Sequence, residues 1–487
     1  MKLLKDLLYD ARIEEIQGTT NIAVEGIGID SRVIKPMGLF VAINGTQVDG
    51  HDYIKQAITN GATSVICERV PEDLIRPKPV TFVVVKNSSI ALGYIASAYY
   101  DHPTNEMKVV AVTGTNGKTT TVTLLHGLLR MLDRKTGLIG TVENRINDKV
   151  VDATHTTPDA LTLQSLFRDM VDSGCKFCFI EASSHAIVQN RLAGTTFAGA
   201  VFTNITHDHL DYHETFDKYL SAKKLLFDIL PSNAFALINS DDPYFEDIVF
   251  ECNAKKVTYG VTSMADFKSR IVENQLQGLH LHIDGQDLYS RLVGSFNASN
   301  LTAVYGVANL LGFEGIETLT QMSLLSPPPG RFELVKSPDG ITAIVDYAHT
   351  PDALDNILRT IATFKTGGER IITVVGCGGE RDSSKRPIMA KVAAAGSDRV
   401  FLTSDNPRSE DPGMILADMQ VGLDPMHKRK CISITDRREA IRAAAAFAES
   451  GDIVIVAGKG HETYQEINEV RHDFDDRIVL RDAFITA

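Results

Sequence analysis

The sequence predicts an α/β protein of three domains, which we place at residues 1–100, 101–329 and 330–487. Short apolar runs rich in β-branched residues alternate with helical patterns, as they do in mostly parallel sheets covered by helices on both faces. The length of 487 residues corresponds to about three domains of ordinary size. Turn-forming residues at 101–105 and 327–330 separate the three units.

The composition is ordinary for a soluble globular protein, with 44% hydrophobic and 23% charged residues. A net charge of −13 argues against a general nucleic-acid binder, which carries a basic patch. Six irregularly spaced cysteines form no disulfide framework, and a redox or metal role for Cys175 and Cys178 is disfavoured because they fall in a predicted buried strand. No apolar run is long enough to span a membrane, and residues 1–16 are charged throughout, so we expect a cytoplasmic protein.

The first domain is predicted to be a small α/β unit. Apolar runs at 39–43, 64–67 and 81–85 alternate with helical patterns at 51–61 and 88–100.

The central domain opens on an apolar strand at 109–112, followed by Gly-Thr-Asn-Gly-Lys-Thr and a helical pattern that reaches Leu132. In such a unit, backbone N–H groups point at an anion, Lys118 adds a positive charge, and the hydroxyl of Thr119 can reach Mg²⁺. The general P-loop has a glycine where this chain has Val112, so the motif is a shortened variant. A plain turn with a solvated lysine is the alternative, but the flanking strand and helix favour a nucleoside triphosphate site.

The rest of the central domain keeps alternating. We expect strands at 135–141, 175–180, 198–205 and 235–239, and helices that begin at Thr157, as the N-cap residue, and at Phe216. This pattern predicts a P-loop-type, mostly parallel sheet. Ligands gather beyond the carboxyl ends of such strands, where the phosphate loop and Glu181 fall.

Glu181 is predicted to be a Mg²⁺ ligand at the end of a buried strand, in the position of a Walker-B acid. An ordinary acid at a strand end is the alternative. Ser183, Ser184 and His185 do not form a Gly-x-Ser-x-Gly nucleophile elbow, so we favour hydrogen bonding to a substrate over nucleophilic catalysis.

Three histidines follow the next strand. His207, His209 and His213 have the look of a zinc cluster, but Asp208 and Asp211 lie between them. One histidine near a phosphate or Mg²⁺ explains the pattern as well as an all-histidine zinc site does.

Lys223 is predicted to point into the protein. It projects from the middle of an apolar helix face, whereas Lys224 projects from the polar face. A lysine aimed at the interior is costly unless it is paired, linked to a metal or modified, although a snorkelling stem is the plain alternative. The apolar face consists of Tyr219, Ala222, Leu226, Ile229 and Leu230.

The third domain is predicted to be a doubly wound sheet of dinucleotide-fold type. Strands at 341–346, 370–375, 399–403, 431–435 and 452–457 alternate with four helical patterns, one of them at 437–449. Arg408 ends an Asp-Asn-Pro-Arg turn directly after a strand and offers a bidentate fork for a carboxylate. A site with arginines and acids suits a zwitterion such as an amino acid. The other strand-end candidates are Arg381, Arg386, Lys459, His461 and Glu462.

Together these motifs resemble the Mur ligases, the ATP-dependent amino-acid-adding enzymes of peptidoglycan synthesis. The resemblance covers all three units and rests on residues 114–119, 181–185, 204–211, 222–223, 296–300, 330–333 and 346–349. Residues 30–32, 46–50 and 405–408 are similar to the members that act at the third step, and the Asp-Asn-Pro-Arg form is associated with meso-diaminopimelate rather than lysine. Diaminopimelate carries a second carboxylate, which Arg408 is able to pair with.

The resemblance implies a role for each matching residue. Ser31, Thr46, Gln47 and Val48 would hold the uridine end, and nearby Met37-Gly38 departs from the Gly-Asp usual in relatives. Thr156, Thr157, Ser183, Gln189 and Arg191 would hold the muramoyl dipeptide. Arg386, Asp405, Asn406, Pro407, Arg408, Gly458 and Glu462 would bind diaminopimelate.

The resemblance also implies ATP and Mg²⁺. ATP would be held by Gly114, Thr115, Asn116, Gly117, Lys118, Thr119 and Thr120, with Asn297, Asn300, Arg331 and Asp346 around the nucleotide. Thr119, Glu181, His209 and a carbamylated Lys223 would arrange the Mg²⁺ ions, and carbamylation explains an inward lysine because it turns the ammonium into a carboxylate. The catalytic set is then Lys118, Glu181, His209 and Lys223.

The implied reaction adds diaminopimelate to the D-glutamate of UDP-N-acetylmuramoyl-L-alanyl-D-glutamate through an acyl phosphate. We expect a monomer that binds neither nucleic acid nor membrane. Three alternatives stay open: the same ligase adding L-lysine, a folylpolyglutamate-type ligase that shares the P-loop variant, and a P-loop regulator without catalytic activity.

Overall fold

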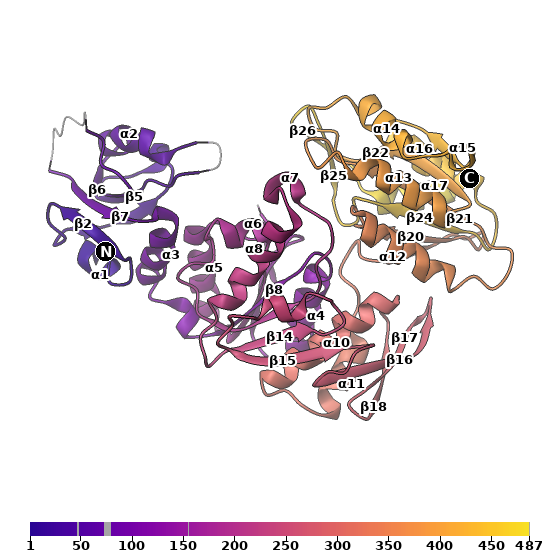
Figure 1. The fold of residues 1–487 in the computed structure, drawn as a ribbon, viewed down its shortest axis with the longest axis horizontal. Coiled ribbons are helices and arrows are strands. Elements are labelled where there is room, and N and C mark those ends of the chain that lie inside the picture. The colour runs from indigo at the N-terminus through magenta and orange to yellow at the C-terminus, as the bar shows by residue number, and fades with distance from the viewer. Residues whose placement is uncertain (46–47, 73–78, 154, 487) are drawn as a thin grey trace.

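A computed structural model of the chain describes residues 1–45, 48–72, 79–153 and 155–486. Figure 1 shows three units in a row, with the N-terminal unit in indigo, the central unit in magenta and the C-terminal unit in orange and yellow. The predicted α/β class with mostly parallel sheets is confirmed. No helix in the described part of the chain is long and apolar enough to cross a membrane.

The N-terminal unit is built on a five-stranded sheet in the order β2-β7-β6-β5-β4. The strands predicted at 39–43, 64–67 and 81–85 are present as β5, β6 and β7. They form a parallel run with β4, in which β4 pairs with β5, β5 with β6, and β6 with β7. The edge strand β2 is antiparallel and was not predicted, because its residues are mostly exposed and charged. The bounds are β1 (Lys2–Leu3), α1 (Leu4–Leu7), β2 (Ile13–Gln17), β3 (Ala23–Val24), β4 (Gly26–Gly28), β5 (Gly38–Val41), α2 (Ile54–Thr59), β6 (Ala62–Cys67), β7 (Thr81–Val85) and α3 (Ser88–Tyr99).

The central unit is built on an eleven-stranded sheet in the order β11-β10-β9-β12-β8-β13-β14-β15-β16-β17-β18. Its middle, from β9 to β16, is parallel, and antiparallel strands extend it at both ends. The sequence predicted the parallel strands β8, β9, β12, β13 and β14, but not β15, β16 or the antiparallel extensions. The strand bounds are β8 (Lys108–Thr113), β9 (Thr136–Ile139), β10 (Asn144–Ile146), β11 (Lys149–Val151), β12 (Phe177–Glu181), β13 (Phe197–Phe202), β14 (Phe235–Asn239), β15 (Lys255–Gly260), β16 (Phe267–Gln275), β17 (Gly278–Ile283) and β18 (Gln286–Ser290).

Helices cover both faces of the central sheet because its buried strands are apolar on both sides. Val109 and Ala111 of β8 pack in one core cluster with residues of α5 and α8, and Val110 and Val112 pack in the other with residues of α4 and α10. The helix bounds are α4 (Lys118–Met131), α5 (Ala160–Asp172), α6 (Ser184–Val188), α7 (Leu210–His213), α8 (Phe216–Asp228), α9 (Phe245–Ile248), α10 (Ser295–Leu310) and α11 (Ile316–Leu324).

The predicted start of α5 is wrong by two residues. Asp159, not Thr157, is the N-cap, and its carboxylate accepts hydrogen bonds from the N–H groups of Leu161 and Thr162. Thr157 is engaged elsewhere, because its hydroxyl donates to the carbonyl oxygen of Glu181 at 2.6 Å. The segment that carries His207, His209 and His213 contains the one-turn helix α7.

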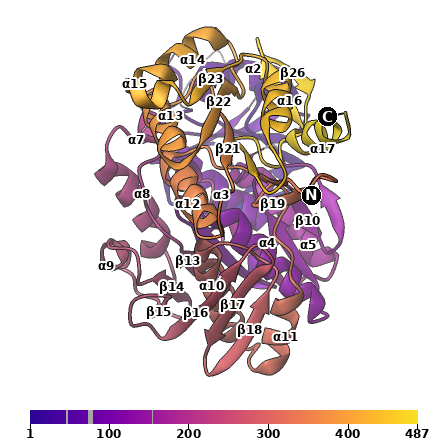
Figure 2. The same ribbon diagram turned by 90° about the vertical axis from the view of Figure 1, so that its right-hand side faces the viewer.

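The C-terminal unit is a six-stranded sheet in the order β19-β20-β24-β21-β22-β23, parallel except for β19. Figure 2 shows α12 and α13 on one side of β21 and α16 and α17 on the other, which is the predicted doubly wound arrangement. The bounds are β19 (Glu333–Lys336), β20 (Thr342–Asp346), α12 (Pro351–Ala362), β21 (Ile371–Cys377), α13 (Lys385–Gly396), β22 (Arg399–Ser404), α14 (Pro412–Val421), α15 (Pro425–Lys428), β23 (Cys431–Ser433), α16 (Arg437–Phe447), β24 (Ile453–Ala457), β25 (Tyr464–Ile467), β26 (Val470–Asp473) and α17 (Asp476–Thr486).

Candidate active site

The phosphate loop has the predicted strand–loop–helix geometry. Strand β8 ends at Thr113, and α4 begins at Lys118. Gly114 and Gly117 have φ angles of 149° and 87°. A Cβ atom on Gly114 would lie 1.9 Å from Thr203 Oγ1, and one on Gly117 would lie 2.5 Å from Asn300 Oδ1. Glycine is therefore required at both positions.

The Lys118 side chain folds back over this loop. Its Nζ donates hydrogen bonds to the carbonyl oxygens of Gly114 and Thr115, each at 2.9 Å. Burial lowers the pKa of Lys118, and the carboxylates of Glu181 and Asp208 oppose that shift. The lysine charge is thus held at the loop that a phosphate group would occupy.

Glu181 lies at the carboxyl end of β12 and is fully buried. Its carboxylate accepts hydrogen bonds from Thr119 Oγ1 at 3.0 Å, Thr141 N at 2.8 Å and Thr141 Oγ1 at 3.1 Å. Within the described residues, no basic side chain lies at ion-pair distance from Glu181. A buried carboxylate without a counter-charge is costly, and carboxylate and hydroxyl oxygens are ligands that suit Mg²⁺.

Lys223 points inward, as its place on the apolar face of α8 predicted. The side chain is 1% exposed, its Nζ donates to the Gly114 carbonyl oxygen at 2.9 Å, and it lies 4.4 Å from the centre of the Tyr219 ring. Burial and the nearby Lys118 charge lower the pKa of Lys223 well below its usual value. Burial and the Lys118 charge thus both act in favour of the neutral amine.

The histidines do not form a zinc site. In the part of the chain that the structure describes, no group of three or more His, Cys, Asp or Glu side chains is placed to hold a metal ion. His213 Nε2 lies 2.9 Å from Ser184 Oγ, and His207 Nε2 lies 3.7 Å from Asp382 Oδ2 of the C-terminal unit. Burial lowers the pKa of His209 to about 3, against the pull of Asp208, so its imidazole is neutral near pH 7.

Three adjoining cavities run between the central and C-terminal units, with volumes of about 380, 160 and 410 Å³. We call them the nucleotide, middle and outer cavities. The nucleotide and middle cavities share Asn116, Gly117, Thr120 and Arg331. The middle and outer cavities share Thr156, Ser183, Asp208, His209, Tyr347 and His349. Lys118, Thr119, Glu181, His209 and Lys223 all line the middle cavity.

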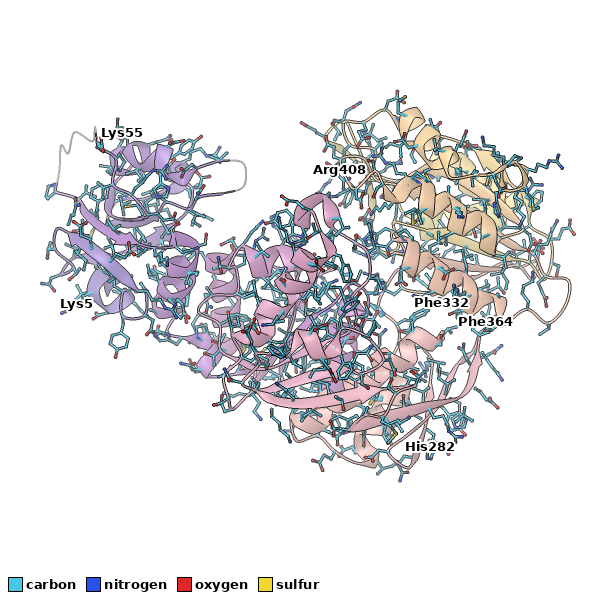
Figure 3. All side chains as sticks on the ribbon, viewed as in Figure 1. Lys5, Lys55, His282, Phe332, Phe364 and Arg408 are labelled. Atoms are coloured by element: carbon cyan, nitrogen blue, oxygen red, sulfur yellow. The ribbon has the colours of Figure 1, made fainter. Side chains whose placement is uncertain are left out.

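The residues predicted around the nucleotide come together. Asn297, Asn300, Arg331 and Asp346 line the nucleotide cavity. Arg331 Nη2 donates to Thr119 Oγ1 at 3.2 Å, and its guanidinium lies over the Tyr347 ring. Asp346 accepts hydrogen bonds from the N–H groups of Phe332 and Ala348, which fixes the junction between the units, where Figure 3 labels Phe332.

The predicted dipeptide residues lie on the central-unit wall of the outer cavity. Thr156, Thr157, Ser183 and Arg191 line it, whereas Gln189 does not. Gln189 Oε1 instead accepts hydrogen bonds from Arg191 Nε and Nη2 at 2.9 and 2.6 Å. Its position suits the orientation of Arg191 rather than direct contact with a ligand.

The predicted amino-acid residues lie on the opposite wall, except for Pro407 and Arg386. Asp405, Asn406, Arg408, Gly458 and Glu462 line the outer cavity, and the carbonyl group of Pro407 lies against Gly379. Arg386 does not line it. Its buried guanidinium binds Glu410 and Asp418, each at 2.9 Å.

Arg381 lines the outer cavity instead. The sequence placed both Arg381 and Arg386 near strand ends, but the resemblance assigned amino-acid binding to Arg386. The two residues lie five positions apart between β21 and the first turns of α13, so no sequence signal separates them.

No sequence pattern marked two further residues that contact the site. Thr141 hydrogen-bonds to Glu181, and Asp352 of α12 accepts a hydrogen bond from Asn116 Nδ2 at 2.9 Å. Both contacts join segments far apart in the sequence.

Of the predicted uridine residues that the structure describes, Ser31 and Val48 line none of these three cavities. Ser31 is buried in the N-terminal unit, where its hydroxyl donates to Gln56 Oε1 at 3.0 Å, and Val48 is exposed. Thr46 and Gln47 lie outside the described residues.

Comparison with known proteins agrees with this fold. Residues 23–100 match the model of the Mur ligase family catalytic domain, residues 112–308 the Mur ligase middle domain, and residues 330–460 the Mur ligase glutamate ligase domain. The chain therefore belongs to the Mur ligase family.

Individual relatives show which kind of Mur ligase the chain is similar to. The chain is 52% identical to the UDP-N-acetylmuramoyl-L-alanyl-D-glutamate–2,6-diaminopimelate ligase of Cytophaga hutchinsonii, over 99% of each chain. It is 49% identical to the protein of the same name from Bacteroides thetaiotaomicron, over 99% of this chain and 100% of the relative. A solved structure of a ligase with that name is similar with a TM-score of 0.70 and 34% identity, covering 100% of this chain and 99% of the other.

Proposed function

We propose that this chain is the ATP-dependent ligase that joins meso-2,6-diaminopimelate to the D-glutamate of UDP-N-acetylmuramoyl-L-alanyl-D-glutamate, in peptidoglycan precursor synthesis. The observation that carries the proposal is the run of three adjoining cavities, whose middle member is lined by Lys118, Glu181 and Lys223. A phosphoryl donor in the first cavity and an acyl acceptor in the last would meet there. The close relatives carry the name of this activity.

The reaction proceeds in two steps. The γ-phosphoryl group of ATP passes to the side-chain carboxylate of D-glutamate, which gives an acyl phosphate and ADP. The amine of diaminopimelate attacks the acyl carbon, and the tetrahedral intermediate collapses to the amide and inorganic phosphate. Lys118 and the amides of the phosphate loop stabilise the charge on the transferring group. The outer cavity holds the dipeptide and the amino acid on opposite walls, which brings the two reactants together.

Mg²⁺ fits the middle cavity because Glu181 is a buried carboxylate without an ion pair in the described residues, beside the hydroxyl of Thr119. Thr119, Glu181, the neutral His209 and the modified Lys223 would hold the ions. When bound, Mg²⁺ would neutralise charge on the phosphoryl oxygens.

Lys223 is carbamylated in the active form. A neutral amine reacts with carbon dioxide, and the low pKa of Lys223 keeps the amine neutral. The carbamate adds a negative group beside Lys118 and gives the middle cavity another oxygen ligand.

The amino acid binds through Arg408 and Arg381. Both line the outer cavity, and both offer planar forks that suit the carboxylates of diaminopimelate. Asp405 and Glu462 line the same wall and suit its ammonium groups. Arg381 replaces Arg386 in this role because the Arg386 guanidinium is already paired.

The three units divide the substrates. Residues 1–100 bind the uridine end through Ser31 and the 46–48 loop, residues 101–329 bind ATP, and residues 330–487 bind the amino acid. The protein acts in the cytoplasm as a monomer and binds no nucleic acid.

Mass spectrometry of the UDP-linked product tests the proposal. Incubation with ATP, Mg²⁺, the UDP-linked dipeptide substrate and diaminopimelate should yield a product enlarged by one diaminopimelate residue, and the Lys118→Ala variant should yield none. If L-lysine gave product at the same rate as diaminopimelate, the proposed specificity for diaminopimelate would be wrong. Extension of a folate by glutamate would instead favour the folylpolyglutamate alternative, and nucleotide binding without any product would favour the regulator.

A further inference from the structure

Arg408 has an unusual backbone for the residue that it is. Its φ angle is 53°, in the left-handed region that residues other than glycine, asparagine and aspartate seldom occupy. Figure 3 labels Arg408 at the edge of the C-terminal unit. A strained backbone of this kind persists only where surrounding contacts hold it in place.

The contacts that hold Arg408 come from the hairpin formed by β25 and β26. The Arg408 N–H donates to the Glu466 carbonyl oxygen at 3.0 Å, and the Asn468 N–H donates to the Arg408 carbonyl oxygen at 2.7 Å. Arg408 thereby pairs with Ile467 as an isolated parallel bridge. Both backbone polar groups of Arg408 are therefore satisfied by a segment more than fifty positions further along the chain.

The same strand also holds the two residues at the start of the turn. Gln465 Nε2 donates to the Asp405 carbonyl oxygen at 2.7 Å, and the Glu466 N–H donates to Asn406 Oδ1 at 3.0 Å. Of these contacts, the one from Gln465 is the one made by a side chain of the hairpin. A substitution there removes one contact and leaves the backbone pairing in place.

The hairpin is not needed to complete the doubly wound sheet. It forms a separate two-stranded sheet, and its residues are half-buried in β25 and exposed in β26. Two-stranded hairpins are marginally stable alone, so this one is stabilised by what it packs against. That partner is the 405–408 turn.

We propose that the β25–β26 hairpin is the template that sets the conformation of the 405–408 turn, with Gln465 as its positioning residue for amino-acid selection. Gln465 fixes the peptide group after Asp405, and the backbone of β25 then fixes Arg408. The Arg408 guanidinium also donates a hydrogen bond to the Gly379 carbonyl oxygen. How far the side chain extends into the outer cavity therefore depends on the position of the Arg408 backbone. This inference rests on the proposed function, because it takes the outer cavity to be the amino-acid site.

Steady-state kinetics of two variants test the inference. Gln465→Leu removes the amide at similar size, and Gln465→Glu keeps the shape but loses the donor. The matched control is His472→Gln, which changes the exposed residue that pairs with Gln465 across the hairpin. We expect KM for diaminopimelate to rise about tenfold in both Gln465 variants, the loss expected for one hydrogen bond. The preference for diaminopimelate over L-lysine should fall, while kcat, KM for ATP and the melting temperature stay near the wild-type values.

Two results would overturn the inference. One is an unchanged KM for diaminopimelate in both Gln465 variants. The other is a parallel loss of kcat, ATP binding and melting temperature, which would mean that Gln465 only stabilises the fold. The wild-type arm separates this inference from the proposed function, because wild-type protein without diaminopimelate-dependent turnover refutes both, whereas normal wild-type turnover with unaffected variants refutes the template alone.

Discussion

Lys118 and Lys223 donate hydrogen bonds to the same oxygen atom, the carbonyl oxygen of Gly114, each at 2.9 Å. Two buried ammonium groups so close together repel each other, and the Lys118 charge contributes to the low pKa of Lys223. The proposed carbamylation of Lys223 would remove this repulsion and replace it with attraction, because the carbamate is negative.

Activity should therefore depend on dissolved carbon dioxide. We expect wild-type turnover to fall in buffer stripped of carbon dioxide and to return when bicarbonate is added. Lys223→Ala should be slower by about 100-fold or more, the usual cost of a lost group that stabilises transition-state charge.

Short carboxylates such as acetate should partly restore Lys223→Ala, because they supply the missing anion. Lys224→Ala is the matched control, since Lys224 pairs with Asp228 and Glu251 on the polar face of the same helix. Absence of rescue, with turnover indifferent to carbon dioxide, would contradict carbamylation.

The contact between Asn116 and Asp352 should contribute to ATP use, because it joins the phosphate loop to the C-terminal unit. We expect Asp352→Ala to lower kcat/KM for ATP by up to about tenfold, as for the loss of a hydrogen bond to a charged group. Asp355→Ala serves as the control, because Asp355 pairs with Arg359 on the same helix. Equal effects of the two substitutions would speak against a role of the Asn116–Asp352 contact in ATP use.

Arg381 and Arg386 should respond differently to alanine substitution. Arg381→Ala should raise KM for diaminopimelate and leave the melting temperature unchanged, because Arg381 is exposed in the outer cavity. Arg386→Ala should lower the free energy of unfolding by about 2 kcal/mol, because it leaves Glu410 and Asp418 without their partner. Thermal melts and amino-acid titrations separate the two effects, and the reverse pattern would restore Arg386 as the binding residue.

The stability of the protein should depend on pH through His126, which is buried in α4 and lies 3.1 Å through Nε2 from the Asn147 carbonyl oxygen. Burial lowers the pKa of His126 from 6.5 to about 4, so below pH 6.5 the unfolded chain binds more protons than the folded one. The contribution of neutral His126 to the free energy of unfolding is complete above pH 6.5 and is lost as the pH falls toward 4.

Urea unfolding across that range measures the effect. His126→Gln, which retains a donor for Asn147, should flatten the dependence by on the order of 3 kcal/mol. His472→Gln changes an exposed histidine and should leave the curve as in the wild type. An unaltered slope in His126→Gln would show that other groups cause the dependence.

The sequence was sufficient to predict the position of site residues that directly follow a buried strand of the central sheet. Lys118 and Glu181 come directly after apolar runs of a parallel sheet, and parallel strands deliver their carboxyl ends to one edge. Lys223 was predicted to face inward from helical periodicity alone, and its 1% exposure confirms that prediction.

The sequence was insufficient where a residue's partner comes from another unit or from a different strand end of the same unit. Asn116 and Asp352 are 236 positions apart, and nothing local marks either one. Arg386 is withdrawn from the cavity by Glu410 and Asp418, which follow the next strand of the sheet. The antiparallel extensions of the central sheet and the β25–β26 hairpin were missed because their strands are short or alternate apolar with polar residues, and so lack the continuous apolar runs that marked the others.

The central claim is that ATP is consumed to join diaminopimelate to the UDP-linked dipeptide. Phosphate release measures it most directly, with ATP, Mg²⁺ and UDP-N-acetylmuramoyl-L-alanyl-D-glutamate present throughout and diaminopimelate, L-lysine or no amino acid added. We predict rapid release with diaminopimelate and only background release in the other two mixtures. Equal release in all three mixtures would contradict the account.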